Sequence, residues 1–239
     1  MIFIFIYEYG TIIIINILGN SCIMADILWQ IRNIRLMVDP ITINRNDPFQ
    51  TLIKTILSHR TKDENTDKAS EVLFKSYPDA RSLKSASLGH VEKLIRPVGF
   101  FTVKAGRVIE VARIIDEELD GIVPRTKEEL MKLPGVGPKT ANCVLVFAYG
   151  FDAIPVDTHV HRIANRLGWV KTKDPVKTEE ALMKIVPKEQ WLMLNELLVN
   201  FGKKVCRPTS PKCGICLIKD SCKYYQDTSS LIKEKSIDN

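Results

Sequence analysis

The segment LPGVGPKTAN at 133–142 constrains this chain more than any other. Gly135 and Gly137 bracket Val136 in a turn with almost no side-chain bulk, so its backbone amides can approach an anion closely. Pro138 suits the first position of a helix, where its missing N–H costs nothing. The segment therefore predicts a turn of exposed amides that opens a helix, which is a site for a phosphate-sized anion.

Helical patterns flank this turn on both sides. Thr126-x-x-Glu129 is a helix-start signal before it, and no apolar strand leads in, which distinguishes the turn from a nucleotide-binding loop. A helix, a glycine hairpin and a second helix suit a backbone phosphate of DNA better than a mononucleotide. Lys139 stands at the start of the second helix, where its amine could act as a nucleophile. In an isolated motif of this kind, a phosphate contact is the commoner role for the lysine.

The body of the chain has a helical pattern. Between Pro48 and Gly202, apolar residues recur at helical spacing, as at Leu52, Ile53 and Ile56. No alternating strand pattern interrupts them. We therefore predict an all-α fold.

The N-terminal segment 1–23 is atypical, because it is apolar, rich in isoleucine and free of lysine and arginine. It lacks the basic start of a signal peptide, and Glu8, Gly10 and Asn16 break it too often for a membrane span. We expect Met24, which precedes an amphipathic helix predicted over 25–38, to be the natural start. A surface-lying anchor is the alternative. We expect no membrane partner.

The net charge and the cysteines indicate what kind of partner and what kind of metal centre the chain has. Lysine and arginine number 34 against 28 acidic residues, a net charge of +6 that suits a polyanionic partner. Four of the six cysteines, Cys206, Cys213, Cys216 and Cys222, fall in one short C-x6-C-x2-C-x5-C loop. Thiolates so crowded favour a metal centre over disulfides. Zinc is the generic expectation, although only Cys213 and Cys216 form the close pair that structural zinc prefers.

The same loop is strongly basic. Between residues 203 and 223 it carries six cations, Lys203, Lys204, Arg207, Lys212, Lys219 and Lys223, against the single carboxylate of Asp220. Such a patch predicts contacts with nucleic-acid phosphates, with Lys212 as the leading candidate. A solvated basic loop is the alternative.

Three motifs of this sequence, in their order along the chain, resemble those of the endonuclease III family. The members of this family are helix-hairpin-helix DNA glycosylases with lyase activity. The motifs are LPGVGPKTAN, VDTHVHR at 156–162 and the four spaced cysteines. The resemblance runs from about Pro48 to about Tyr224. It implies a two-lobed all-α fold with the active site in the cleft between a six-helix lobe and an iron–sulfur lobe. The implied ranges are 41–151 for the six-helix lobe, 24–40 with 152–226 for the iron–sulfur lobe, and 227–239 for a flexible C-terminal tail.

The resemblance also implies roles for the residues that carry chemistry. Lys139 corresponds to the Schiff-base nucleophile, and Asp157 to the carboxylate that helps to activate it and supports positive charge on the sugar. For Asp157 the alternative is plain capping of a helix. Relatives that only remove bases lack this lysine, so its presence implies a bifunctional glycosylase and abasic-site lyase. The four cysteines match the ligands of a [4Fe–4S] cluster, whose four ligands leave no open position for substrate.

Further residues are candidates for contact with DNA. Arg60 and Phe100 align with positions that enter the base stack in the family, and both differ from the residues usual in bacterial relatives. Their alternatives are a surface arginine and a core phenylalanine. Gly135 and Gly137 would offer hairpin amides to phosphate, and His159 would contact phosphate or be only a partly exposed histidine.

The expected function is base-excision DNA repair. The resemblance implies removal of oxidised pyrimidines from duplex DNA, followed by β-elimination at the abasic site. A G·T or G·U mismatch glycosylase of the same fold, or a non-catalytic DNA-binding or redox module, are the alternatives. We expect a monomer that acts on double-stranded DNA inside the cell, in the cytoplasm or nucleoid, where an iron–sulfur centre is assembled.

Overall fold

The structure is a computed structural model, and it describes residues 3–8, 11–16, 20–41 and 46–237. Side chains are described for residues 24–41 and 46–230. The chain divides into two compact units. One is Thr42–Pro155, and the other combines Met1–Ile41 with Val156–Asn239, so the chain leaves the second unit and returns to it.

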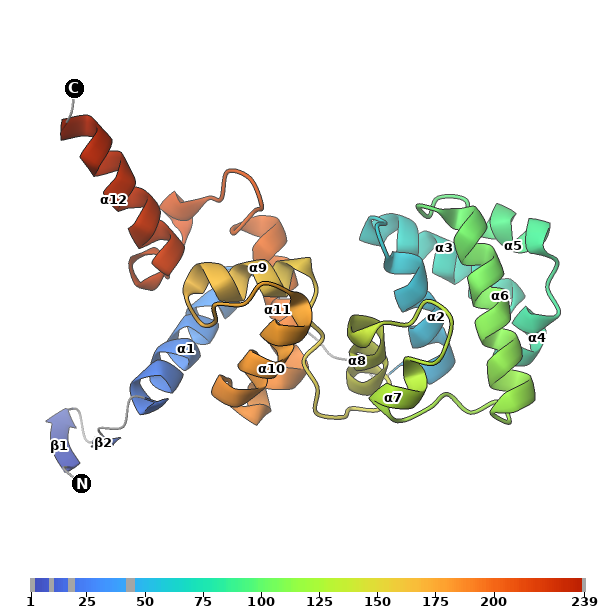
Figure 1. Ribbon diagram of the computed structural model, residues 1–239, viewed down its shortest axis with the longest axis horizontal. Coiled ribbons are helices and arrows are strands. Elements are labelled where there is room, and N and C mark those ends of the chain that lie inside the picture. Colours follow the sequence, from blue (N-terminus) through green and yellow to red (C-terminus); the bar gives the residue numbers. More distant parts are fainter. Residues whose placement is uncertain (1–2, 9–10, 17–19, 42–45, 238–239) are drawn as a thin grey trace. The chain divides into compact units, whose positions relative to one another are not determined.

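The Thr42–Pro155 unit is helical. Its described residues form six helices of five or more residues and one four-residue turn of helix (Figure 1): α2 (Pro48–Ser58), α3 (Asp63–Ser76), α4 (Ala80–Lys84), α5 (Leu88–Leu94), α6 (Phe101–Glu118), α7 (Lys127–Leu130) and α8 (Pro138–Phe147). Helix α2 is the centre of this unit, because it packs against α3, α6 and α8. Its side chains Leu52, Ile53, Ile56 and Leu57 are completely buried, as their spacing predicts.

Side-chain caps set several helix starts in this unit. Asp47 accepts a hydrogen bond from Gln50 N at 2.8 Å before α2, and Asp79 accepts one from Ser82 N at 2.8 Å before α4. The predicted start at Thr126 is also present, since its hydroxyl accepts from Glu129 N at 3.3 Å. Such caps satisfy amides that the first helical turn leaves without partners.

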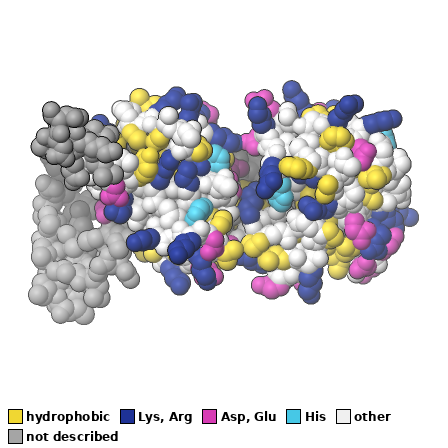
Figure 2. Space-filling view, turned by 45° about the horizontal axis from the view of Figure 1, so that its top comes forward, with side chains coloured by type: hydrophobic (Ala, Val, Ile, Leu, Met, Phe, Trp, Pro, Cys, Tyr) yellow, Lys and Arg dark blue, Asp and Glu magenta, His cyan; other side chains and the backbone are white. Residues whose placement is uncertain are grey.

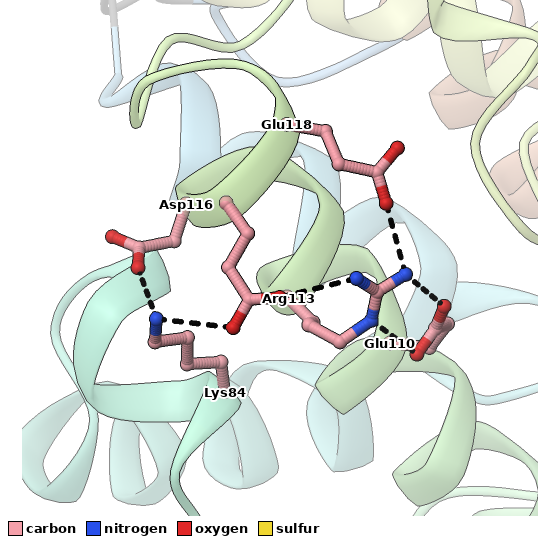
Figure 3. Close-up of polar contacts among 6 residues, drawn as sticks. Lys84, Glu110, Arg113, Asp116 and Glu118 are labelled. Carbon is pink, nitrogen blue, oxygen red and sulfur yellow. Dashed lines mark hydrogen bonds and ion pairs between the residues drawn. The ribbon is translucent and has the colours of Figure 1, made fainter.

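Ion pairs join α4 to α6 on the surface of this unit (Figure 3). Lys84 Nζ lies 2.6 Å from Asp116 Oδ2 and 3.2 Å from Glu117 Oε1. Arg113 binds Glu110, Glu117 and Glu118 at 2.8–3.2 Å, and these hydrogen bonds raise the pKa of its guanidinium. The group holds four carboxylates and two cations, so this face repels a polyanion.

The second unit holds α1 (Asn20–Arg35) and the helices that follow Pro155. These are α9 (Thr158–Leu167), α10 (Pro175–Ile185), η1 (Lys188–Gln190), α11 (Trp191–Lys204), η2 (Cys213–Ile215), η3 (Lys219–Ser221) and α12 (Lys223–Ile237). Helix α9 packs against α10, α11 and α12, and α1 packs against α10 and α11. Gln30 of α1 hydrogen-bonds to the Trp169 indole and to Ser221, so the N-terminal helix supports the loop that carries the cysteines.

The all-α prediction is confirmed for the body of the chain, and the N-terminal segment adds one small sheet. Strands β1 (Phe3–Glu8) and β2 (Thr11–Asn16) pair antiparallel, with Phe3 opposite Asn16 and Glu8 opposite Thr11. The sheet is none of the structures weighed for this segment from sequence, which are a signal peptide, a membrane span and a surface-lying anchor. Its isoleucines and aromatic residues are strand formers, which is the signal that was missed.

Most of the C-terminal range 227–239 lies within a helix, and its flexibility stays a prediction. Helix α12 continues from Lys223 to Ile237, because Gln226, Lys233 and Glu234 are good helix formers and no glycine or proline interrupts them. In the part of the chain that the structure describes, no helix is both long and apolar enough to cross a membrane.

Candidate functional site

The glycine hairpin connects α7 to α8. Gly135 has a φ of +75°, a left-handed conformation that favours glycine, and a Cβ there would overlap the side chain of Arg107 from α6. Gly137 is the N-cap residue of α8 and is extended, with a φ of −104°. A Cβ on Gly137 would meet no described atom within 4 Å. The left-handed backbone therefore explains the glycine at 135, whereas the space beside Gly137 is open to a partner from outside.

The start of α8 presents amides and one lysine together. Pro138 occupies its first turn, as predicted, and Gly137 supplies no side-chain cap. The first amides of α8 are therefore left to bind an anion. Lys139 follows at once and is partly exposed. The structure thus brings Gly135, Gly137 and Lys139 together at one helix end.

A histidine lies beside this helix end. His59 Nε2 is 3.0 Å from the hydroxyl oxygen of Thr140, the residue after Lys139. Burial, followed by the positive charges of Lys139, Lys104 and Arg107, lowers the pKa of His59 from 6.5 to about 4. His59 is therefore neutral at physiological pH, so it can hydrogen-bond to Thr140 without adding charge.

This shift makes stability depend on pH. The pKa of His59 is lower in the folded protein than in the unfolded chain, so unfolding takes up a proton between pH 6.5 and 4. We expect the free energy of unfolding to fall as the pH drops through this window, and to fall less in the His59→Gln variant. Urea unfolding at a series of pH values measures this, with the exposed His90→Gln as the matched control. Equal pH dependence in wild type and His59→Gln would contradict the assignment.

Asp157 caps helix α9 in the second unit. Its Oδ1 accepts hydrogen bonds from His159 N at 2.8 Å and Val160 N at 2.9 Å. The capping alternative is therefore present in the structure. Both bonds go to the same oxygen, so capping uses only Oδ1 and leaves the charge of the partly exposed carboxylate available for chemistry.

His159 packs inside the second unit. Its ring lies against Gly202, where a Cβ would overlap Nδ1, and the Arg162 guanidinium lies 3.2 Å from the same Nδ1. Arg162 also donates to Cys206 O at 2.9 Å, and burial lowers the pKa of its guanidinium. His159 thus has a packing role, while its contact with phosphate stays a prediction.

The four predicted cysteines gather in one loop, and all four are free thiols. Burial raises the pKa of Cys216 to about 11, and the charges of Cys222, Cys206 and Cys213 act in the same direction. Burial also raises the pKa of Cys213 and Cys222. Each thiol is therefore close enough to the others for electrostatic interaction.

The surroundings of these sulfurs fit a cluster of thiolates. Backbone amides partly offset the effect of burial, since that of Ile218 lowers the pKa of Cys216 and those of Tyr224 and Tyr225 lower the pKa of Cys222. Arg166 braces the loop by donating to Arg207 O at 2.6 Å and Pro208 O at 2.7 Å, and its guanidinium lies 4.4 Å from the Tyr224 ring centroid. Among the described residues, no three His, Cys, Asp or Glu side chains are arranged closely enough to form a metal group. The donor type fits a four-thiolate centre, but in the described structure the four sulfurs do not lie close enough together to form a metal group.

The segment that carries the four cysteines has exposed basic side chains. Lys212 is exposed next to Cys213 and is fixed through its backbone N, which donates to Val205 O at 2.9 Å. Figure 2 shows lysine and arginine side chains over the visible face of each unit. This distribution agrees with a polyanionic partner.

Arg60 and Phe100 lie together in the Thr42–Pro155 unit. The Arg60 guanidinium carbon is 5.8 Å from the centroid of the Phe100 ring. Arg60 is exposed, and 63% of Phe100 is exposed, which excludes the core-phenylalanine alternative. A large aromatic side chain so far from the core is available to a partner.

Sequence reasoning missed Lys104 and Arg107, which lie on α6, and His59. Lys104 is only 4% exposed, and burial, followed by the charge of Arg107, lowers its pKa to about 8. The signal was the position of Lys104 on the apolar face of α6, where Ala105, Val108 and Val111 are buried. A lysine at such a position must satisfy its ammonium inside the protein.

Comparison with known proteins identifies the family. A family model described as HhH-GPD superfamily base excision DNA repair protein matches residues 53–188. The chain is 49% identical over 180 residues to endonuclease III of Thermotoga maritima, which covers 75% of this chain and 84% of the relative.

Similarity to solved structures supports the same family. A trapped covalent intermediate of endonuclease III with DNA superposes with a TM-score of 0.79 at 32% identity, covering 86% of this chain and 98% of that one. A thermostable thymine-DNA glycosylase superposes with a TM-score of 0.73 at 26% identity, covering 87% and 97%.

Proposed function

Because this chain belongs to the endonuclease III family of HhH-GPD base excision DNA repair proteins, we propose that it removes oxidised pyrimidines from duplex DNA and then cleaves the abasic site through a Schiff base on Lys139. The coarser activity, that of a base excision repair glycosylase and lyase, follows from the family itself. The observation that carries the finer proposal is a lysine at an uncapped helix start directly after a glycine hairpin.

The chemistry needs an amine and a carboxylate. The Lys139 amine attacks C1′ of the deoxyribose, the bond from C1′ to the base breaks, and the base leaves with the bonding electrons and takes up a proton. The negative charge of Asp157 stabilises the positive sugar of that transition state. The bond from C1′ to the ring oxygen O4′ then breaks, O4′ takes up a proton, and the open sugar is left as a protonated Schiff base, which acidifies C2′. Loss of a C2′ proton expels the 3′ phosphate, and water releases Lys139.

Binding uses the hairpin and the exposed side chains. Backbone amides near Gly135 and Gly137 hold a DNA phosphate, with Lys212 and His159 as further phosphate contacts. Arg60 and Phe100 enter the base stack when the damaged base is extruded, so that the aromatic ring replaces lost stacking. Since binding neutralises phosphates, it weakens steeply as salt is raised.

A panel of duplexes with single lesions tests this proposal. Thymine glycol, uracil opposite guanine and thymine opposite guanine are incubated side by side with the protein, with and without alkali. Cleavage of the thymine-glycol strand without alkali supports the proposal. Binding without strand cleavage on any duplex would favour a DNA-binding or redox module instead.

A mismatch glycosylase is the second candidate, favoured by the similarity to a thermostable thymine-DNA glycosylase. In that case the uracil and thymine mismatches would be processed and thymine glycol would not. The same panel therefore separates the two candidates.

We propose that Cys206, Cys213, Cys216 and Cys222 hold a [4Fe–4S] cluster. The cluster would link the ends of this loop and support its basic surface, and the thiolates would be deprotonated on binding iron. We expect purified protein to contain iron and inorganic sulfide in equal amounts, and Cys213→Ser to lose both. Elemental analysis measures this, with the buried Cys143→Ser as control. Zinc in place of iron would contradict the assignment.

We further propose that the Thr42–Pro155 unit is the six-helix lobe and the second unit the iron–sulfur lobe. Because a repair enzyme of this family acts on DNA, we propose that it works inside the cell, in the cytoplasm or nucleoid. We propose that it acts as a monomer.

A further inference from the structure

Two loops that carry exposed side chains are joined at one end of the Thr42–Pro155 unit. One contains Arg60 and the other Phe100. Both residues have left-handed backbone conformations, with φ of 52° and 57°. Residues other than glycine adopt this conformation at a cost, and it persists only where the surrounding structure enforces it. A buried lysine, Lys104, lies beside both loops.

Lys104 holds the first loop through its ammonium group. Its Nζ donates to Leu57 O at 2.7 Å, to His59 O and to Thr61 Oγ1 at 3.1 Å. These oxygens lie at and just beyond the C-terminal end of α2, where helix carbonyls lack partners within the helix. Three acceptors match the three donors of an ammonium, so the buried charge is satisfied.

The ammonium of Lys104 reaches the second loop through Thr61, and the backbone of Lys104 makes an ordinary helix bond to the same loop. Its backbone N donates to Phe100 O at 3.1 Å, in the first turn of α6. Thr61 Oγ1, which receives the Lys104 ammonium, also accepts a hydrogen bond from Gly99 N at 3.1 Å. The loops pass so closely that a Cβ on Gly99 would lie 2.7 Å from Arg60 O.

We propose that Lys104 is a positioning residue that fixes Arg60 and Phe100 as one rigid probe for base extrusion. The inference rests on the proposed function, because only a duplex with an intact damaged base requires extrusion. An abasic site has no base to extrude, so cleavage there depends far less on the probe. Lys104 therefore affects removal of the damaged base and leaves cleavage of the abasic strand almost unchanged.

The test compares two substrates in single-turnover reactions. We expect Lys104→Met to slow base removal from a thymine-glycol duplex by about 10- to 100-fold, as a displaced catalytic or substrate-positioning group does. Cleavage of a preformed abasic duplex should change less than about threefold, because the lyase groups keep their positions. Methionine keeps the length and fills the space without charge. Lys54→Met is the matched control, since Lys54 is an exposed lysine paired with Asp67 at 2.7 Å.

A second variant keeps the test decisive if Lys104→Met does not fold. Thr61→Val removes the oxygen shared by Lys104 and Gly99 N but leaves the bonds to Leu57 and His59. We expect Thr61→Val to slow base removal from the thymine-glycol duplex by a smaller factor than Lys104→Met does. Cleavage of the preformed abasic duplex should again be almost unchanged. Fluorescence of 2-aminopurine placed beside the lesion should rise with wild type, as the stack opens, and rise less with either variant.

Two outcomes overturn the inference. In one, the variants that fold lose both reactions in parallel, which is the result of a merely structural lysine. In the other, base removal is unchanged. If wild-type protein fails to cleave the preformed abasic duplex, the proposed function fails instead, so the two failures are distinguishable.

Discussion

Lys139→Ala is expected to lose strand cleavage at a preformed abasic site by about a thousandfold or more, because it removes the nucleophile itself. The start of α8 should persist, since Pro138 and Gly137 set it and alanine is a good helix former. Binding to the abasic duplex should fall only slightly, because the hairpin amides remain. Single-turnover cleavage and a separate binding titration measure the two effects.

Lys93→Ala is the matched control for charge, because Lys93 is an exposed lysine on α5 of the same unit. It should cleave at the wild-type rate. If Lys139→Ala binds and cleaves as wild type does, another group forms the Schiff base. If binding and cleavage fall equally, Lys139 is only a phosphate contact, which was the alternative for the isolated motif.

Asp157→Asn is expected to give the second large effect, a fall of about 100-fold or more in removal of the damaged base. Asparagine caps helices as well as aspartate does, so the bonds to His159 N and Val160 N should remain. The substitution therefore removes charge and preserves the cap. Single-turnover base removal measures the rate, and thermal unfolding checks the fold.

The matched control for Asp157 is another capping aspartate. Asp174 caps α10 by accepting a hydrogen bond from Lys177 N at 2.9 Å. Asp174→Asn should leave both the rate of base removal and the thermal stability unchanged. Full base removal by Asp157→Asn would show that the carboxylate serves only the helix.

Local signals in the sequence were sufficient for most of the fold. The apolar spacing of α2 predicted its buried face, and Asp157 and Pro138 marked the starts of α9 and α8. These features depend on residues within a few positions of one another, so they can be read along the chain. The N-terminal hairpin and the extent of α12 were missed, because apolar or polar tracts without periodicity leave conformation open.

The candidate site was only partly accessible from sequence. Motif spacing gave Lys139, Asp157 and the cysteines. Contacts between distant residues gave the rest: His59 meets Thr140, and Lys104 meets the end of α2. Such pairs follow from tertiary packing, which no local pattern in a single sequence encodes.

The contact between Arg60 and Phe100 is another tertiary contact that no local sequence pattern predicts. Each was a separate candidate in the sequence, with a surface or core alternative. Their cation–π contact and shared left-handed conformations depend on two loops about forty residues apart meeting at Gly99. The close approach of Gly99 to Arg60 O explains why glycine stands there.

The most direct test of the account is to identify the residue that becomes attached to the sugar. Wild-type protein is incubated with an abasic duplex and borohydride, which reduces a Schiff base to a stable amine, and the adduct is digested and sequenced by mass spectrometry. We predict that the sugar is found on the peptide containing Lys139 and that Lys139→Ala forms no adduct. An adduct on another residue, or none with wild type, would contradict the account.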